Sequence, residues 1–221
     1  MPPKGGLRVT TEVLKSLAGS RDKPISLLVA SIGNPLPYEN TRHNAGHDVG
    51  RAIFGQSSNL GLGQRTSKQL GEQGTLHTFD HQGITYFESK QYMNVSGNAI
   101  KRLMKWYKEE GYKRVPQGTI PQLLILHDEL DVKLGKVSYK APTRRGNNGQ
   151  NGLKSIVEKI PDDFARLRIG ISRPDERSPD VIAQYVLERW TPREEQVLWE
   201  TTIPATEAFF QQLVSSGILA T

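Results

Sequence analysis

The feature that most constrains this fold is a pair of short apolar runs at residues 25–32 and 123–126. The first run stops at the turn signal Gly33-Asn34-Pro35, and the second leads directly into the polar residues 127–131. Short apolar runs that end in this way are typical of strands buried on both faces of a parallel sheet. Open α/β sheets assemble their functional sites beyond the carboxyl ends of such strands, so the polar residues after each run are the first candidates for function.

The rest of the chain alternates predicted strands and helices. Further strands are predicted at residues 74–79, 84–88, 135–140 and 165–171, with the first two joined as a hairpin. Helices are predicted from Asn44, from Ser96 up to Gly111, at 153–159, and near 180–188 and 193–215, with Asn44 and Ser96 as caps. Residues 55–71, rich in Gly, Ser, Gln and Asn, are predicted to form a surface loop. No repeat or composition break follows residue 24, which predicts one α/β domain over residues 24–221.

Residues 1–23 differ from the domain that follows them. They carry five Lys or Arg against two acidic residues and show no core pattern before Pro24. This composition is compatible with a disordered extension, a short helix or an organelle-targeting segment. No apolar run in the chain approaches the ~20 residues that span a bilayer, so we expect no membrane segment.

Cysteine content and charge balance narrow the classes of function. A chain without cysteine cannot use thiol catalysis, disulfide frameworks or cysteine-ligated zinc. The net charge of +6 favours a polyanionic partner, although the excess could serve only solubility. The motifs of phosphate-binding loops, dinucleotide-binding folds, serine esterases and zinc peptidases are missing, so those classes lose their usual marker.

Five polar residues at predicted element ends could together carry out a hydrolysis: His43, Asp128, Asn34, Asn94 and Asn151. A histidine can take a proton from water, and a carboxylate bonded to its second ring nitrogen fixes the tautomer. Asparagine amides can stabilise an oxyanion and bind a substrate amide without carrying charge. These residue types favour hydrolysis of an acyl ester by activated water.

Each assignment has an alternative without catalysis. His43 alone is typical of a polar loop residue, and the asparagines could cap turns or helices. Asp128, Glu129 and Asp131 could share a hard cation, an arrangement ranked lower because no other acidic cluster supplies the remaining oxygens. His127 is the rival base, but neighbours on a strand point to opposite faces, so His127 faces away if Asp128 faces the cleft.

Six blocks of the chain resemble the bacterial-type peptidyl-tRNA hydrolase family, in the family's order, over residues 25 to about 190. They are Gly33-Asn34-Pro35 with Tyr38, Thr41-Arg42-His43-Asn44-Ala45-Gly46, Met93-Asn94-Val95-Ser96-Gly97, His127-Asp128-Glu129-Leu130-Asp131, Asn151-Gly152-Leu153-Lys154-Ser155-Ile156 and Arg166-Leu167-Arg168-Ile169-Gly170. Any one block is weak, whereas six co-linear blocks make the resemblance specific.

The resemblance implies a mixed, mostly parallel sheet flanked by helices, and an enzyme that cleaves the ester between peptide and tRNA. It implies that His43 is the general base and that Asp128 orients it. It also implies a set of substrate-binding residues: Asn34, Tyr38, Met93, Asn94 and Asn151. Of these, Asn151 would lie on a mobile gate loop. Lys140 and Arg168 would form a clamp on the tRNA 5′ phosphate. It further implies a monomer that acts on the acceptor stem and 3′ end of peptidyl-tRNA without metal or other cofactor, in the cytoplasm or the mitochondrion.

The chain departs from the family pattern around the gate loop. Gln150 stands where the family usually has a histidine, and Thr143-Arg144-Arg145 lengthens the approach to it. Leu36-Pro37 also replaces the usual glycine after Asn34-Pro35. These departures keep open an RNA-binding protein of the same fold that has lost turnover and works in RNA processing. An esterase or peptidase for small substrates is a third possibility, distinguished by whether cleavage requires a tRNA acceptor mimic.

Overall fold

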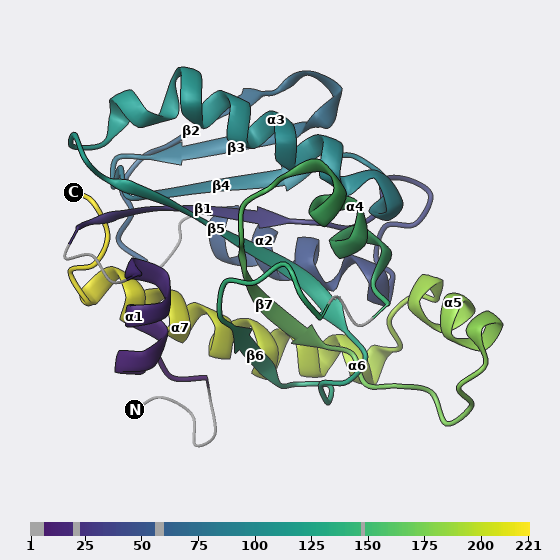
Figure 1. Cartoon of the computed structure of the whole chain (residues 1–221). Helices are drawn as coiled ribbons and strands as arrows, with labels where there is room; N and C mark the ends of the chain where they lie inside the picture. The colour runs from purple at the N-terminus through teal and green to yellow at the C-terminus, as the bar shows by residue number, and fades with distance from the viewer. Residues whose placement is uncertain (1–6, 20–22, 56–59, 147–148) are drawn as a thin grey trace.

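The computed structural model of the chain describes residues 7–19, 23–55, 60–146 and 149–221 (Figure 1). Within these residues, seven strands form one sheet in the order β2-β3-β4-β1-β5-β7-β6. The strands are β1 Ile25–Ser31, β2 Arg65–Gln69, β3 Gly74–Phe79, β4 Ile84–Ser89, β5 Ile120–Glu129, β6 Val137–Lys140 and β7 Ala165–Gly170. The strands β4, β1, β5 and β7 run parallel, and the outer pairs are antiparallel. The predicted mixed, mostly parallel sheet is therefore confirmed.

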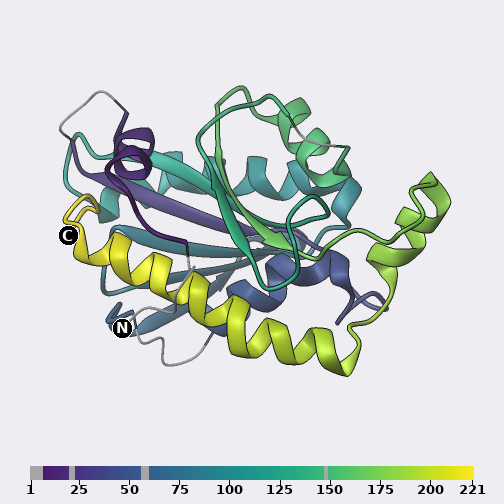
Figure 2. The ribbon, with the colours of Figure 1, turned by 90° about the horizontal axis from the view of Figure 1, so that it is seen from below.

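Helices cover both faces of this sheet (Figures 1 and 2). The helices are α1 Thr11–Ala18, α2 Ala45–Phe54, α3 Ser96–Glu109, α4 Asn151–Lys159, α5 Pro179–Leu187, α6 Pro192–Val197 and α7 Ile203–Ser215. Short helical turns are η1 Arg42–Asn44, η2 Gly71–Gln73, η3 Met93–Val95, η4 Gly111–Arg114 and the π-helical η5 Leu198–Thr202. The helices α3 and α4 share one apolar core with the sheet, and α2 and α7 share the other. No helix in the described part of the chain is long and apolar enough to cross a membrane.

The position of β1 between two cores explains its sequence. All of its residues are buried. Leu27 and Val29 belong to the core under α2 and α7, whereas Leu28 and Ala30 belong to the core under α3 and α4. A strand whose alternate side chains enter two cores needs apolar residues at successive positions. The predicted buried strand at residues 25–32 is confirmed to within one residue.

The loop predicted at residues 55–71 is wrong in its second half. Residues 65–69 form β2, an edge strand in which Ser67 pairs with His77 of β3. Residues 56–59 lie outside the described residues. Every side chain of β2 is exposed, so the strand has no apolar alternation that a sequence pattern could detect. A charged and polar edge also discourages pairing with other chains.

Two predicted helix caps are also wrong. The Asn44 side chain makes no cap bond to α2 and instead exchanges two hydrogen bonds with the backbone of Asn34. Ser96 is the first residue of α3, and its hydroxyl donates to the Met93 carbonyl at 2.9 Å. At Asn44 the fold brings a backbone partner ten residues away, so this side chain connects two segments. At Ser96 the partner is a local carbonyl three residues earlier in the chain.

The described part of the N-terminal segment is a short helix that packs on the domain. The hydroxyl of Thr10 caps α1 by accepting from the Val13 amide, and Leu17 is completely buried. The Val9 amide donates to the Gln212 side chain at 3.0 Å. The short-helix alternative therefore holds for residues 11–18, while residues 1–6 and 20–22 lie outside the described part. The domain boundary at residue 24 stays a prediction.

Candidate active site

The strongest feature of the site is a hydrogen bond between His43 and Asp128. His43 lies in η1, after the loop that leaves β1, and Asp128 is the last but one residue of β5. The distance from His43 Nδ1 to Asp128 Oδ2 is 2.8 Å. Because a carboxylate only accepts, Nδ1 carries the proton, and Nε2 is the ring nitrogen that can act as a base. The predicted orientation of His43 by Asp128 is thus present in the structure.

Close packing of α2 on β5 places η1 beside the end of that strand. A Cβ atom at Gly46 would overlap the Leu126 carbonyl oxygen, so the first turn of α2 can approach β5 only with glycine there. Ala45 is completely buried on the same turn. The sequence His43-Asn44-Ala45-Gly46 therefore fixes where the imidazole stands relative to Asp128.

Burial and mutual charge set the titration of this pair. Burial lowers the pKa of His43, but the charge of Asp128 and its hydrogen bond raise it, and the net pKa lies above the ordinary value. Burial raises the pKa of Asp128, but the neighbouring imidazole, its hydrogen bond and the Gln150 amide lower it, and the net pKa lies below the ordinary value. The carboxylate therefore stays charged wherever His43 titrates, which suits it to stabilise an imidazolium.

Asn34 is held at three points and is almost completely buried. Its backbone exchanges hydrogen bonds with the Asn44 side chain at 2.7 and 2.8 Å. Its Oδ1 accepts from the Met93 amide at 2.9 Å, so the amide face is fixed. Among the described residues its Nδ2 has no partner, which leaves one neutral donor available to a ligand.

The remaining predicted substrate residues are brought to the same region without direct contacts to the pair. Met93 is buried, and its sulfur accepts from the Gln150 amide at 3.3 Å. Asn94 is exposed on η3, Asn151 is exposed at the start of α4, and these two elements pack together. Tyr38 is 37% exposed in the loop before η1. The side chains of Asn94, Asn151 and Tyr38 make no hydrogen bond to another described residue.

Gln150 is the residue that sequence reasoning did not recognise as part of the site. It is the N-cap of α4, with Oε1 accepting from the Leu153 amide at 2.9 Å, so the cap role considered for Asn151 is wrong. Its Nε2 donates to Asp128 Oδ1 at 2.9 Å. Its spacing from Leu153 could have indicated the cap, but only the fold brings it to Asp128.

The rival arrangements around Asp128 do not compete with the pair. His127 is buried on the opposite side of β5, as strand alternation predicts, and its Nδ1 bonds the Asp128 carbonyl oxygen. Glu129 pairs with Arg168 at 3.7 Å, and Asp131 pairs with Arg173 at 2.7 Å. The described residues contain no group of three His, Asp or Glu placed to hold a metal ion.

Lys140 and Arg168 lie on the outer strands β6 and β7, on one face with a third cation. Sheet register sets Lys140 opposite Arg166 and Ser138 opposite Arg168. The Arg168 guanidinium donates to the Ser138 hydroxyl at 2.7 Å. Arg166 was not among the predicted residues, and its buried guanidinium donates to the carbonyls of residues 143, 145 and 146. Burial and the two arginine charges lower the pKa of Lys140, as expected for crowded cations.

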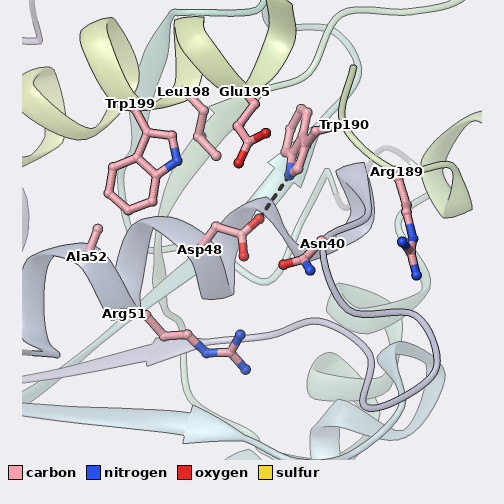
Figure 3. A pocket seen from close by; sticks show the side chains of 9 residues that line it. All are labelled: Asn40, Asp48, Arg51, Ala52, Arg189, Trp190, Glu195, Leu198 and Trp199. Atoms are coloured by element: carbon pink, nitrogen blue, oxygen red, sulfur yellow. Dashed lines mark hydrogen bonds between the residues drawn. The ribbon is translucent and has the colours of Figure 1, made fainter. Parts of the chain in front are cut away.

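A separate cavity of about 510 Å³ lies between α2 and the segment that carries α6 and η5 (Figure 3). Its lining residues are Asn40, Asp48, Arg51, Ala52, Arg189, Trp190, Glu195, Leu198 and Trp199. The Trp190 indole donates to Asp48 at 2.9 Å, and burial raises the pKa of Asp48 to about 6. The cavity includes none of the predicted site residues, so we place the candidate site at His43 and Asp128.

The fold and the site together define an α/β enzyme with a hydrogen-bonded histidine–carboxylate pair at the carboxyl ends of its parallel strands. The chain matches the family model described as peptidyl-tRNA hydrolase over residues 28–221. It belongs to the peptidyl-tRNA hydrolase family. Relatives of that name include those of Wolinella succinogenes, 36% identical over 84% of this chain and 88% of the relative, and of Chloroflexus aggregans, 34% identical over 87% and 95%. A crystal structure of peptidyl-tRNA hydrolase from Acinetobacter baumannii matches with a TM-score of 0.67 and 30% identity, over 90% of this chain and 92% of that one.

Proposed function

We propose that this chain hydrolyses the ester bond between peptide and tRNA in peptidyl-tRNA, with water activated by His43. The observation that carries the proposal is the 2.8 Å bond from His43 Nδ1 to Asp128, which leaves Nε2 as the base. Nε2 takes a proton from water, and the water oxygen attacks the ester carbonyl carbon. The tetrahedral oxyanion then collapses, the bond to the ribose oxygen breaks, and the imidazolium returns its proton to that oxygen. Peptide acid and free tRNA are the products.

The asparagine amides would supply recognition without charge. Asn34 offers a fixed donor beside the pair, and Asn94 and Asn151 offer exposed amides on the two elements that pack next to it. Such amides can stabilise the oxyanion and pair with the peptide bond nearest the ester. Tyr38 and Met93 would contact the rest of the substrate. A free amine would leave these amides unpaired, which explains how the enzyme would spare aminoacyl-tRNA.

Lys140 and Arg168 would hold the 5′ phosphate of the tRNA. Arg168 lies on β7, which pairs with the strand that carries Asp128, and Lys140 lies on β6, which pairs with β7. The overall charge of the chain is +6. Arg168 also has Glu129 as a neighbour, which leaves Lys140 as the more available cation. Phosphate contacts of this kind position a nucleic acid without reading its sequence.

The compartment and assembly state follow from the same proposal. Peptidyl-tRNA arises where translation occurs, so the enzyme would work in the cytoplasm or the mitochondrion. The family resemblance further implies that it would act as a monomer. Residues 24–221 would form the catalytic domain. Cell fractionation tests the proposed compartment, and the molar mass in solution tests the proposed monomer. No observation favours an RNA-binding protein without turnover.

The decisive experiment measures release of labelled N-acetyl-aminoacyl product from tRNA. We expect multiple turnover by the wild type and a loss of about 10²-fold or more in His43→Ala. The matched control is His77→Ala, on β3 between β2 and β4 and away from the pair, which should keep the wild-type rate. A normal rate in His43→Ala contradicts the mechanism, and equal cleavage of substrates with and without N-acylation contradicts the proposed selectivity. Activity on small esters alone would favour a different esterase.

A further inference from the structure

The two ends of the Gln150 side chain bond different partners, and its Nε2 also donates to the Met93 sulfur at 3.3 Å. Its Oε1 accepts from the Leu153 amide at 2.9 Å and so closes the first turn of α4. Its Nε2 donates to Asp128 Oδ1 at 2.9 Å. Because the cap bond fixes the direction of the amide, the second bond follows from the first. One side chain therefore links the start of a helix to the carboxylate of the catalytic pair.

Both oxygens of the Asp128 carboxylate are engaged as a result. Oδ2 bonds His43 at 2.8 Å and Oδ1 bonds Gln150 at 2.9 Å. The carboxylate is 3% exposed, so water has little access to replace either partner. A carboxylate held at one oxygen can still rotate about its bond to Cβ, whereas one held at both oxygens has a fixed plane. The second bond thus fixes the direction from which Oδ2 meets the imidazole.

We propose that Gln150 is a positioning residue, which orients Asp128 and through it His43 only while the first turn of α4 is formed. The inference rests on the proposed function of the pair. Since an amide does not titrate, Gln150 keeps this donor at every pH.

The loop that leads to Gln150 is anchored at its other end. The Arg166 guanidinium donates to three carbonyls, of residues 143, 145 and 146. Lys140 donates to the carbonyl of Gly146 as well, at 3.2 Å. Cations of β6 and β7 therefore hold residues 143–146, which precede Gln150 in the chain.

The two bonds of Gln150 can be separated by substitution. In Gln150→Ser a short side chain still caps the helix well but is too short to reach Asp128. In Gln150→Glu an oxygen still accepts from Leu153, while the donor becomes a second negative charge beside Asp128. The titratable groups nearest Asp128 are His43, which faces it from η1, and His127, whose ring lies on the opposite side of β5 and whose pKa is lowered by burial. Thr10→Ala is the matched control, because it removes the cap of α1 away from the site.

The test measures kcat, KM and the thermal midpoint of all four proteins, with kcat/KM followed against pH. For Gln150→Ser we expect kcat to fall about 10-fold to 100-fold with KM and the thermal midpoint nearly unchanged. For Gln150→Glu we expect a similar fall and a shift of the acid limb to higher pH, because the added charge favours protonated His43. Thr10→Ala should lower only the thermal midpoint.

Wild-type kcat and pH profiles in both Gln150 variants would overturn the inference. So would a loss of rate that only follows the unfolded fraction, as in the control. His43→Ala separates this failure from failure of the proposed function. If His43→Ala is inactive and the Gln150 variants are normal, only the role of Gln150 is wrong. If His43→Ala is active, the proposed mechanism itself is wrong.

Discussion

At the residue scale, the character of His43 depends on one buried neighbour. The imidazole is mostly buried, and burial by itself favours the neutral ring. The charge of Asp128 reverses this preference and moves the net pKa above the ordinary value. As the proposed base, His43 would therefore be stronger than a free histidine, and it would be available only above its raised pKa. In the proposed mechanism the same 2.8 Å contact would set both the rate and its pH dependence.

Asp128→Asn tests this relation. Removing the charge leaves burial as the main influence, so the pKa of His43 falls. We expect kcat/KM of the wild type to decline as the pH falls through a pKa above 6.5. In Asp128→Asn the plateau should drop about 10²-fold or more, and the acid limb should move to lower pH. The control Asp131→Asn removes an exposed partner of Arg173 and should change neither. If the acid limb of Asp128→Asn stays at the wild-type pH, the proposed effect of Asp128 on the pKa of His43 is refuted.

At the scale of elements, the turn that carries His43 is held from two sides. The first turn of α2 approaches β5 closely through Gly46. On the other side, buried Arg42 binds Glu194 of α6 through two bonds of 2.9 Å and contacts Glu188 at 3.1 Å. Its guanidinium also lies 4.2 Å from the centre of the Tyr185 ring. The C-terminal helices thus support the position of η1.

Arg42→Ala should therefore destabilise the protein and impair its site. It leaves Glu194 without its bidentate partner, and we expect a loss of about 2–3 kcal/mol in the free energy of unfolding. Urea denaturation measures this loss, and kcat at a temperature below both midpoints measures the effect on η1. Arg42→Lys should recover part of the stability, because the charge remains but the planar fork does not. Arg193→Ala, an exposed arginine on α6, should change stability by less than about 0.5 kcal/mol. Equal losses in the two alanine variants would disprove the role of Arg42.

At the scale of the whole molecule, the parallel centre of the sheet brings distant chain segments to one edge. β1 and β5 are adjacent and parallel, so the residues after both strands meet although 85 positions separate His43 from Asp128. The antiparallel outer pair β6 and β7 adds three cations beside that edge. Arg166 is buried, so Lys140 and Arg168 are the two cations that a substrate could reach. Their place beside the proposed site would suit a substrate with a long polyanionic part.

Lys140→Ala and Arg168→Ala test the charge distribution. Each variant should weaken tRNA binding and reduce the slope of log K against log salt by about 0.7–0.9 for each lost phosphate contact. Binding at several salt concentrations measures the slope, and cleavage of a short acceptor mimic without the 5′ phosphate should be unaffected. Lys105→Ala on α3, where Lys105 pairs with Glu109 at 3.7 Å, is the control. Unchanged slopes in both clamp variants would reject the clamp.

The interior strands and the candidate pair could be predicted from the sequence because their signals are local. An interior strand such as β1 must be apolar at successive positions, and its carboxyl end must be followed by polar residues. His43 and Asp128 stand at such ends, and the resemblance assigned their roles. The predictions for β2 and for the two helix caps failed because local sequence patterns do not show a side chain's actual partner. β2 is polar on both faces, and the Asn44 side chain bonds the backbone of Asn34 in place of the helix end. Ser96 bonds the local Met93 carbonyl instead of capping its helix.

Sequence by itself determined the buried strands, the family and the residues that can do the chemistry, because hydrophobic periodicity and residue type are properties of the chain. Only the tertiary structure decided which of these residues touch. The 2.9 Å bond from Gln150 to Asp128 and the three bonds from Arg166 to the preceding loop depend on packing between β5, β7 and α4. A hydrogen bond needs its two atoms within about 3 Å, and no local pattern in a sequence specifies that distance for residues far apart in the chain.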